Sequence, residues 1–386
     1  MTISSVAHFR EHTSKSATRF RLHWPAKLAT VSFVNFKGIA IVRIFDCFSG
    51  IGGFRSAAKM AFKGAAHFVG HCEIDKYANR TYAAMHCVDG KSEIAITDLT
   101  TITRDSTGKL CTPKHVRSLL PAQILAPDLF CAGFPCQPHS LMGNREGSKD
   151  ARGALVDDML VFIEAILPKF IILENVRAVK SVNSGQFFSG LIYRLKKSYH
   201  MNFIEANAAN FGVPQVRRRL FIAGSIERDP VLQPKEIDIS KASYPSTWHL
   251  LEECVDEKFY LSEKIKKTIL ADEHKGYFRK AEINRILARP LTRTMHKMHR
   301  ASQDNYYSDS YIHGDFDESS RVVHELRKGR SRIRRITPRE ALRIQSFSDD
   351  EIERALASGV SDTQLYMQAG NAVPALLAKA ILETIT

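Results

Sequence analysis

The stretch IVRIFDCFSGIGGF (residues 41–54) joins an apolar, β-branched run to a glycine-rich turn and then to a helix-like segment. A short run of this kind, bounded by turn residues, is typical of a strand. Gly50, Gly52 and Gly53 would let a ligand approach backbone that a Cβ atom would block, and the start of the next helix favours an anionic group. The stretch therefore predicts a strand–turn–helix unit with a ligand-binding turn.

Further apolar runs follow along the chain, separated by amphipathic stretches. They are AHFVGHC (66–72), SEIAI (92–96), PDLFCA (127–132), KFIIL (169–173) and RLFIAG (219–224). The clearest helix is ALVDDMLVFIEAILP (154–168), where apolar residues recur at helical spacing until Pro168. Strands that alternate with helices predict an α/β fold with a doubly wound, mostly parallel sheet. Ligands of such sheets bind in the loops after the carboxyl ends of the strands.

The alternation of strands and helices fades after Gly224. Prolines, charges and polar aromatic segments follow, and helix-like stretches return only near the end, at TPREALRIQSF (337–347) and ALLAKAILETI (375–385). We therefore expect four parts: a basic N-terminal extension (1–40), a catalytic and cofactor-binding domain (41–224), a smaller inserted domain (225–335) and a return to the catalytic domain (336–386).

The chain is basic, with 55 Lys and Arg against 41 Asp and Glu, a net charge of +14 and a pI near 9.4. Such an excess attracts polyanions, nucleic acid first. Residues 1–44 and 321–335 are especially basic; each could also be a solvated segment, and the first an organelle presequence. No apolar run is long enough to span a bilayer, and the seven unpaired-looking cysteines suit a reducing compartment, so we expect a cytoplasmic protein.

Acidic residues follow the second and third predicted strands. Glu73 could accept hydrogen bonds from a ribose diol, and Asp98 could receive an exocyclic amine. The glycine spacing at 50–53 departs from the dinucleotide pattern, and the turn lacks the lysine of a P-loop. A nucleoside without a phosphate chain fits these features, S-adenosylmethionine being the common one. The alternative is a structural turn with two solvated acids.

Cys136 lies in GFPCQPHS (133–140), directly after the fourth predicted strand. As a metal ligand it would need Cys131 and His139, whose spacing lacks the usual C-x-x-C clamp. An inert buried thiol suits Cys131 better, because Cys136 follows the strand end in a Gly-Pro loop. A nucleophile that faces a cleft is the leading interpretation, and no metal is expected.

A carboxylate and two guanidinium groups complete the candidate site. Glu174 and Asn175 end the fifth predicted strand, and QVRRR (215–219) leads into the sixth, with Arg217 and Arg219 on one side. Because Glu174 follows four apolar residues, it should be partly desolvated, which raises the pKa of its carboxyl group and lets it carry a proton.

With these motifs in order, the chain resembles the DNA (cytosine-5)-methyltransferases, especially those of bacterial restriction–modification systems. The similarity covers residues 41–386. The matching motifs are DCFSGIGGF (46–54), EIDKYA (73–78), TDL (97–99), GFPCQPHS (133–140), ENV (174–176), QVRRR (215–219), RRITPREALRIQSF (334–347) and GNAVP (370–374). The resemblance implies the S-adenosylmethionine-dependent methyltransferase fold with an inserted target-recognition domain. It also implies methylation of C5 of a cytosine within a specific double-stranded DNA sequence.

The resemblance also implies residue roles. Cys136, Glu174, Arg217 and Arg219 would be catalytic: the Cys136 thiolate adds to C6 of a flipped-out cytosine while Glu174 holds N3 and N4. Cofactor-binding residues would be Phe48, Gly50, Ile51, Gly52, Gly53, Glu73, Ile74, Asp98, Leu99, Asn371 and Val373. DNA-binding residues would be Gln137, Ser140, Asn175, Gln215, Thr292 and Arg300, with Thr294, Gln303 and Asn305 as further candidates by residue type.

Two other functions use the same residues. A branch of this family methylates cytosine in tRNA, and the basic extension at 1–40 could make the chain a DNA-binding autoregulator as well. For the leading function we expect a monomer that acts on double-stranded DNA, near the nucleoid, with a cognate restriction endonuclease acting separately.

Overall fold

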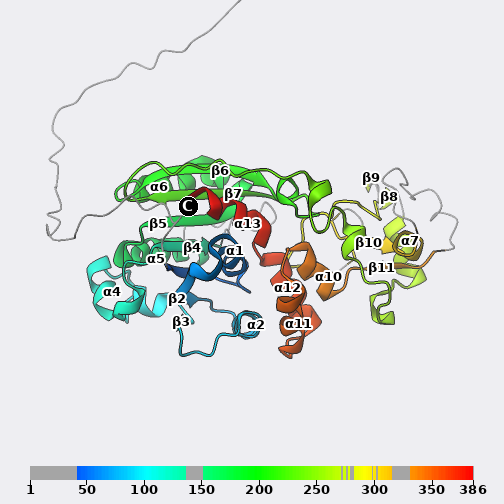
Figure 1. The fold of residues 1–386 in the computed structure, drawn as a ribbon, viewed down its shortest axis with the longest axis horizontal. Helices are drawn as coiled ribbons and strands as arrows, with labels where there is room; N and C mark the ends of the chain where they lie inside the picture. Colours follow the sequence, from blue (N-terminus) through cyan, green and yellow to red (C-terminus); the bar gives the residue numbers. More distant parts are fainter. Residues whose placement is uncertain are drawn as a thin grey trace, which may run out of the picture. The chain divides into compact units, whose positions relative to one another are not determined.

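The structure is a computed structural model of the chain (Figure 1). It describes residues 41–135, 151–270, 273–274, 277–278, 282–297, 299–300, 303–314 and 331–385. The expected extension at 1–40 and the candidate residues Cys136, Gln137, His139 and Ser140 lie outside the described residues.

A sheet of seven strands organises the first half of the described chain (Figure 1). Its order is β3-β2-β1-β4-β5-β7-β6. The strands are β1 (Val42–Cys47), β2 (Ala66–Cys72), β3 (Ile94–Ile96), β4 (Leu129–Gly133), β5 (Phe170–Val176), β6 (His200–Asn207) and β7 (Arg218–Ser225). Strands β1 to β5 pair in parallel, whereas β7 is antiparallel to both β5 and β6. This confirms the predicted α/β fold with a mostly parallel sheet.

Strand β6 was absent from the sequence prediction. It is an edge strand in which only Ala206 is buried, so its sequence HMNFIEAN carries no apolar run. Central strands must be apolar on both faces, but an edge strand beside solvent need not be. The connection from β6 to β7 is also short, which requires antiparallel pairing because a parallel crossover needs a dozen or more residues.

Helices pack on the sheet and form its main apolar core. They are α1 (Gly53–Phe62), α2 (Lys76–His86), α3 (Thr100–Thr103), α4 (Pro113–Leu119), α5 (Ala151–Ile166) and α6 (Gln186–Leu195), with the single turns η1 (Lys63–Ala65), η2 (Ala122–Ile124) and η4 (Ala208–Phe211) and the longer, kinked segment η3 (Arg177–Gly185). Phe162 of α5 packs on Phe45 of β1, with ring centroids 5.0 Å apart. The predicted helix at 154–168 is confirmed as α5, which ends before Leu167 takes a φ of 50°.

The remaining described elements are short. They are η5 (Ile239–Lys241), η6 (Thr247–Leu250), η7 (Glu257–Phe259), α7 (Glu263–Leu270), β8 (Glu273–His274), β9 (Tyr277–Phe278), β10 (Tyr306–Ser308), α8 (Asp309–Ile312), β11 (Ile333–Arg335), α10 (Pro338–Ile344), α11 (Asp349–Ala357), α12 (Asp362–Asn371), α13 (Ala375–Leu382) and η8 (Glu383–Ile385). Helix α13 packs on α1, which brings the C-terminal residues to the glycine turn. The expected domain boundaries at 225 and 335 stay a prediction. No helix in the described part of the chain is long and apolar enough to cross a membrane.

Candidate active site

The turn after β1 is shaped by left-handed backbone. Phe48, Gly50 and Gly52 have φ values of 51°, 55° and 86°, and α1 begins at Gly53. Only glycine takes such φ values without a steric cost, and a Cβ built on Gly50 would meet no atom within 4 Å. Open space beside a glycine turn at a strand end is what a bound ligand requires.

Glu73 ties the end of β2 to this turn. Its Oε2 accepts a hydrogen bond from the Gly50 backbone N–H at 2.9 Å, and its Oε1 accepts one from Asp75 at 2.8 Å. Burial raises the pKa of Glu73, although the two backbone donors oppose the shift. Each oxygen of the carboxylate can accept a further hydrogen bond, so Glu73 can accept hydrogen bonds from the hydroxyl groups of a ligand beside the turn.

The residues expected around the cofactor base lie on neighbouring strand ends. Leu99 is buried in the apolar core against which Phe48 packs, whereas Ile74 is 70% exposed. Asp98 Oδ1 accepts hydrogen bonds from the Thr100 backbone N–H at 2.9 Å and hydroxyl at 2.8 Å, which fixes the orientation of its carboxylate. The sheet thus brings the predicted cofactor residues of β1, β2 and β3 to one edge.

Val373 lies between the glycine turn and Glu174. A Cβ built on Gly53 would clash with the Val373 carbonyl oxygen. One built on Gly133, at the end of β4, would lie 3.5 Å from Val373 Cγ2 and 3.6 Å from Glu174 Oε2. Asn371 ends α12 and is exposed, so its expected cofactor contact stays a prediction.

Glu174 and Arg219 form a buried pair at the ends of β5 and β7. Arg219 Nε lies 2.8 Å from Glu174 Oε1, and about a tenth of each side chain is exposed. Burial raises the pKa of Glu174, against the opposing charges of Arg219 and Arg217. The carboxyl group can therefore hold a proton at a higher pH than a solvated glutamate can.

Asn175 positions the chain that leads to Cys136. Its Nδ2 donates to the Phe134 carbonyl oxygen at 3.0 Å, and Phe134 is itself buried. Glu174 is the parallel register partner of Gly133, so the strand that leads to Cys136 runs beside the acid. Asn175, expected to bind DNA, is thus buried and engaged with the backbone here.

Arg217 and Gln215 are buried and bind backbone. Arg217 is 2% exposed, and its guanidinium donates to the carbonyl oxygens of Leu291 at 2.8 Å, Gly370 at 3.0 Å and Ala372 at 3.0 Å. Gln215 Oε1 accepts the Leu291 N–H at 3.1 Å. Together these residues join the start of β7 to two later segments of the chain. The roles expected for them, catalysis for Arg217 and DNA binding for Gln215, stay predictions.

Three of the expected DNA readers, Thr292, Thr294 and Arg300, form one hydrogen-bonded group. Arg300 donates to Thr292 Oγ1 and Thr294 Oγ1, each at 3.1 Å, and pairs with Asp304 at 3.0 Å. Asn305 is bonded to the backbone of Arg289 through both ends of its amide. Gln303 is exposed.

A family model for C-5 cytosine-specific DNA methylases matches residues 42–386. The chain belongs to this family. It is similar to the type II methyltransferase M.NlaX of Neisseria lactamica, with 30% identity over 346 residues that cover 88% of the chain and 95% of that protein. M.HpaII of Haemophilus parainfluenzae, also a type II methyltransferase, is 30% identical over 370 residues, which cover 88% and 89% respectively. The chain is accordingly a DNA cytosine-5-methyltransferase.

Solved structures support the fold. The Entamoeba histolytica methyltransferase EhMeth aligns with a TM-score of 0.65 and 22% identity, over 89% of this chain and 98% of that one. The S. pombe methyltransferase Dnmt2 aligns with a TM-score of 0.67 and 18% identity over the same shares. The fold of this methyltransferase is therefore shared with these two methyltransferases, and its mostly parallel sheet is as the sequence predicted.

His86 is a site residue that the sequence analysis missed. Its Nε2 lies 3.0 Å from the Ile51 carbonyl oxygen, and a Cβ on Gly52 would clash with its ring. Burial lowers the pKa of His86 well below its ordinary value, and its ring packs against the turn. A single histidine in an amphipathic helix gives no sequence signal, since most such residues are simply packed in the core.

The described residues contain no group of three or more His, Cys, Asp or Glu side chains placed to hold a metal ion. Cys131 is buried within β4, and burial raises the pKa of its thiol well above the ordinary value. Since Cys136 and His139 lie outside the described residues, the expectation that the methyltransferase uses no metal stays a prediction.

Proposed function

We propose that the enzyme methylates C5 of a cytosine within a specific double-stranded DNA sequence, through a covalent bond between Cys136 and C6 of a flipped-out base. The observation that carries the proposal is the buried Glu174–Arg219 pair, 2.8 Å apart. It lies beside Gly133, three positions before Cys136 in the sequence.

The proposed chemistry needs an acid and a nucleophile at one flat ring. C6 of cytosine is a poor electrophile unless N3 is protonated or hydrogen-bonded. Glu174, whose pKa is raised by burial, supplies this proton as the Cys136 thiolate adds to C6. Arg219, which pairs with Glu174, would donate to the cytosine O2.

The later steps restore aromaticity. Addition at C6 makes C5 nucleophilic, and C5 takes up the methyl group, which S-adenosylmethionine supplies when bound. Loss of the C5 proton to a base and departure of Cys136 as the thiolate then re-form the C5–C6 double bond. The proton on N3 returns to Glu174, and the base releases the C5 proton to solvent, which regenerates the enzyme.

The residues at the glycine turn fit S-adenosylmethionine. Gly50 leaves open space, and Glu73 offers a fixed carboxylate that suits a ribose diol. Asp98, oriented by Thr100, suits the adenine amine. Val373 would close the space between this turn and the reacting base.

The base must leave the helix stack to reach such a pocket. Extrusion costs a few kcal/mol, which contacts with the duplex must offset. The net charge of +14 supports phosphate contacts that would hold the duplex while base contacts specify the sequence.

Two measurements test this function. Bisulfite sequencing of DNA from cells that express the enzyme should reveal methylated cytosines within one short sequence. An oligonucleotide with 5-fluorocytosine at that position should form an adduct that survives denaturation, because fluorine at C5 blocks the release step. Cys136→Ser should form no adduct, and Glu174→Gln should form it far more slowly; full activity in Cys136→Ser would exclude the nucleophile.

A comparison of methyl transfer to duplex DNA and to tRNA separates the two possible substrates. We expect methyl transfer to duplex DNA and not to tRNA; transfer to tRNA alone would replace DNA as the substrate. We further propose a monomer in the cytoplasm, associated with the nucleoid through DNA, that protects host DNA from a separate restriction endonuclease. A footprint that changes when residues 1–40 are removed would support the autoregulatory alternative.

A further inference from the structure

The recognition segment, as we call the described residues of 291–304, is anchored at its start. The Leu291 N–H donates to Gln215 at 3.1 Å, and the Leu291 carbonyl oxygen accepts from Arg217 at 2.8 Å. A Cβ on Gly370 would clash with the backbone of Thr292, so the segment lies directly against the end of α12. Its first residues are therefore fixed to the part of the enzyme that holds Glu174.

Arg300 holds the segment together from within, and we call its contacts with Thr292, Thr294 and Asp304 the brace. Its guanidinium donates to Thr292 and Thr294 at 3.1 Å each and to Asp304 at 3.0 Å, while its backbone N–H donates to Asp304 Oδ2 at 2.9 Å. Asp304 is 8% exposed, and burial raises its pKa while Arg300 opposes the shift. The polar groups of these residues are thus engaged inside the segment and are poorly placed to meet DNA.

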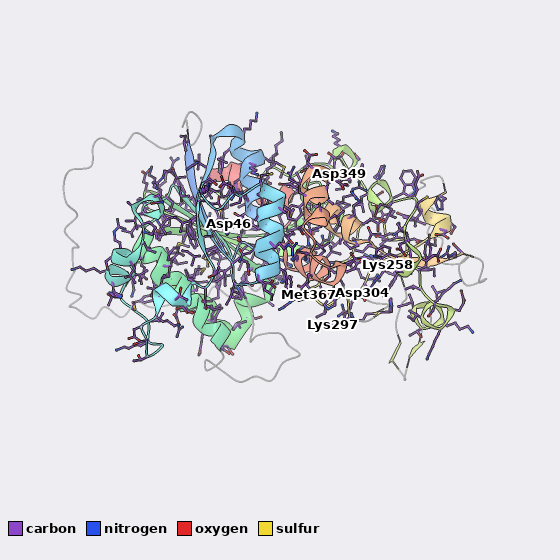
Figure 2. The ribbon with its side chains drawn as sticks, turned by 90° about the horizontal axis from the view of Figure 1, so that it is seen from below. Asp46, Lys258, Lys297, Asp304, Asp349 and Met367 are labelled. Atoms are coloured by element: carbon purple, nitrogen blue, oxygen red, sulfur yellow. The ribbon has the colours of Figure 1, made fainter. Side chains whose placement is uncertain are left out.

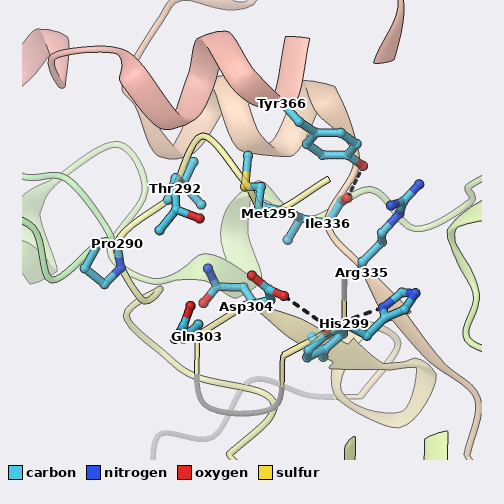
Figure 3. Close-up of a pocket in the computed structure, with 12 residues that line it drawn as sticks. Pro290, Thr292, Met295, His299, Gln303, Asp304, Arg335, Ile336 and Tyr366 are labelled. Carbon is cyan, nitrogen blue, oxygen red and sulfur yellow. Dashed lines mark hydrogen bonds between the residues drawn. The ribbon is translucent and has the colours of Figure 1, made fainter. Parts of the chain in front are cut away.

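The segment has an inner and an outer side. Thr292 and Met295 line a pocket with Tyr366 of α12 (Figure 3). Arg293 and Lys297 do not line this pocket, and both are exposed. The backbone between them forms two successive turns, in which the Met295 N–H donates to the Thr292 carbonyl oxygen and the Lys297 N–H to that of Thr294. Figure 2 labels Lys297 and Asp304 of this segment.

Neither cation has an ion-pair partner in the described part of the chain. No described carboxylate lies within ion-pair distance of Arg293 or Lys297. Some other exposed cations of the enzyme do have such partners, for example Lys258 with Asp362 at 2.9 Å. Two exposed cations of this kind on the outer side of a braced, anchored segment suit a polyanion.

We propose that Arg293 and Lys297 contact the phosphates of the target duplex, and that Arg300, Thr292, Thr294 and Asp304 are positioning residues that hold them in place. This revises the expectation that Thr292 and Arg300 read DNA directly. The inference rests on the proposed function, since it takes duplex DNA as the substrate.

The salt dependence of DNA binding tests the contacts. The probe is a duplex fragment that the wild-type enzyme methylates, titrated without methyl donor. Each lost phosphate contact should lower the slope of log affinity against log salt by about 0.9, so Arg293→Gln with Lys297→Gln should lower it by about 1.8. Between about 50 mM and 200 mM salt, the wild type should lose roughly tenfold more affinity than this double variant. Lys109→Gln, on an exposed lysine between α3 and α4, is the matched control.

A charge-removing variant tests the brace. Asp304→Asn makes the enzyme more positive, so simple electrostatics predicts tighter DNA binding. The brace predicts weaker DNA binding. Arg300→Gln should weaken binding by the same amount, and Asp304→Asn combined with Arg300→Gln should weaken it no further, because either change breaks the same contacts. Equal or tighter binding by Asp304→Asn would reject the brace.

The outcomes separate this inference from the proposed function. An enzyme that fails to methylate duplex DNA at all removes the function and the inference together. Suppose instead that the wild type methylates DNA, but Arg293→Gln with Lys297→Gln keeps the salt slope of DNA binding seen for the wild type and for Lys109→Gln. Only the assignment of Arg293 and Lys297 is then wrong.

Discussion

Replacement of Arg217 by methionine should destabilise the enzyme far more than replacement of its neighbour. The guanidinium of Arg217 donates to three backbone carbonyl oxygens, those of Leu291, Gly370 and Ala372, within 2.8–3.0 Å. Methionine fills a similar volume but donates nothing, so three buried acceptors lose their partner. The comparison is Arg218→Met, because Arg218 is exposed and adjacent in the chain.

The magnitude follows from two opposing effects. A buried acceptor left without a donor costs about 1–3 kcal/mol, so three of them together cost about 3–9 kcal/mol. Burial also penalises the charge itself, since it lowers the pKa of Arg217 well below the ordinary value, and methionine removes that penalty. We expect a net loss of about 3 kcal/mol, a large part of the roughly 5–15 kcal/mol of a typical domain.

Urea unfolding followed by fluorescence measures this difference. Arg217→Met should unfold at a clearly lower urea concentration than the wild type, and Arg218→Met within about 0.5 kcal/mol of it. The Michaelis constant for DNA should rise in Arg217→Met, because Leu291 is the start of the recognition segment. Equal unfolding midpoints for the two variants would refute the assignment of the three carbonyl contacts.

Three further substitutions test other parts of the site. Because burial raises the pKa of Glu174, its ionisation in the folded state costs stability as pH rises, so the unfolding free energy of Glu174→Gln relative to wild type should increase as pH rises above the ordinary pKa of a glutamate, while activity is lost. Gly53→Ala, which clashes with Val373, should cost about 1–3 kcal/mol and raise the Michaelis constant for S-adenosylmethionine. Glu340→Gln breaks the buried pair with Arg334 and should cost about 3–5 kcal/mol in urea unfolding.

Each of these has a matched control. Glu205→Gln changes a half-exposed acid and should show its pH dependence in the opposite direction, since Lys180 lowers the pKa of Glu205. Gly64→Ala adds a Cβ that meets nothing within 4 Å. Glu353→Gln removes an exposed partner of Arg339 and should cost less than about 1 kcal/mol.

The sheet was predictable because its central strands are buried on both faces. Phe45, Phe130 and Ile171 are fully buried, so each of their strands reads as a largely apolar run. Strand β6 has solvent on one edge and needs no such run, which is why its existence and the antiparallel end of the sheet escaped prediction. Apolar patterns report burial, and an edge strand has little of it.

The positions of Glu73 and Glu174 could be predicted from the rule that ligands bind in the loops after the carboxyl ends of the strands, since this rule depends only on the fold. Glu73 and Glu174 end β2 and β5 and lie beside the glycine turn and Gly133. Residue type could not assign the polar groups that bind distant backbone. Gln215 and Arg300 were expected to bind DNA, and that expectation stays a prediction; what the sequence could not show is that Gln215 binds backbone 76 positions away and that Arg300 binds its own segment.

The contacts form one path from the recognition segment to the reacting groups. Leu291 and Ala372 share the guanidinium of Arg217, and Val373, the next residue, lies between Gly53 of the cofactor turn and Glu174. A shift of the recognition segment cannot leave Arg217 satisfied unless the residues at 370–373 move with it. If the recognition segment contacts DNA as proposed, duplex binding and the closure of the catalytic pocket are mechanically coupled, and a duplex seated in the wrong register would misplace Val373. Discrimination between sequences should then appear in the rate of the chemical step as well as in affinity.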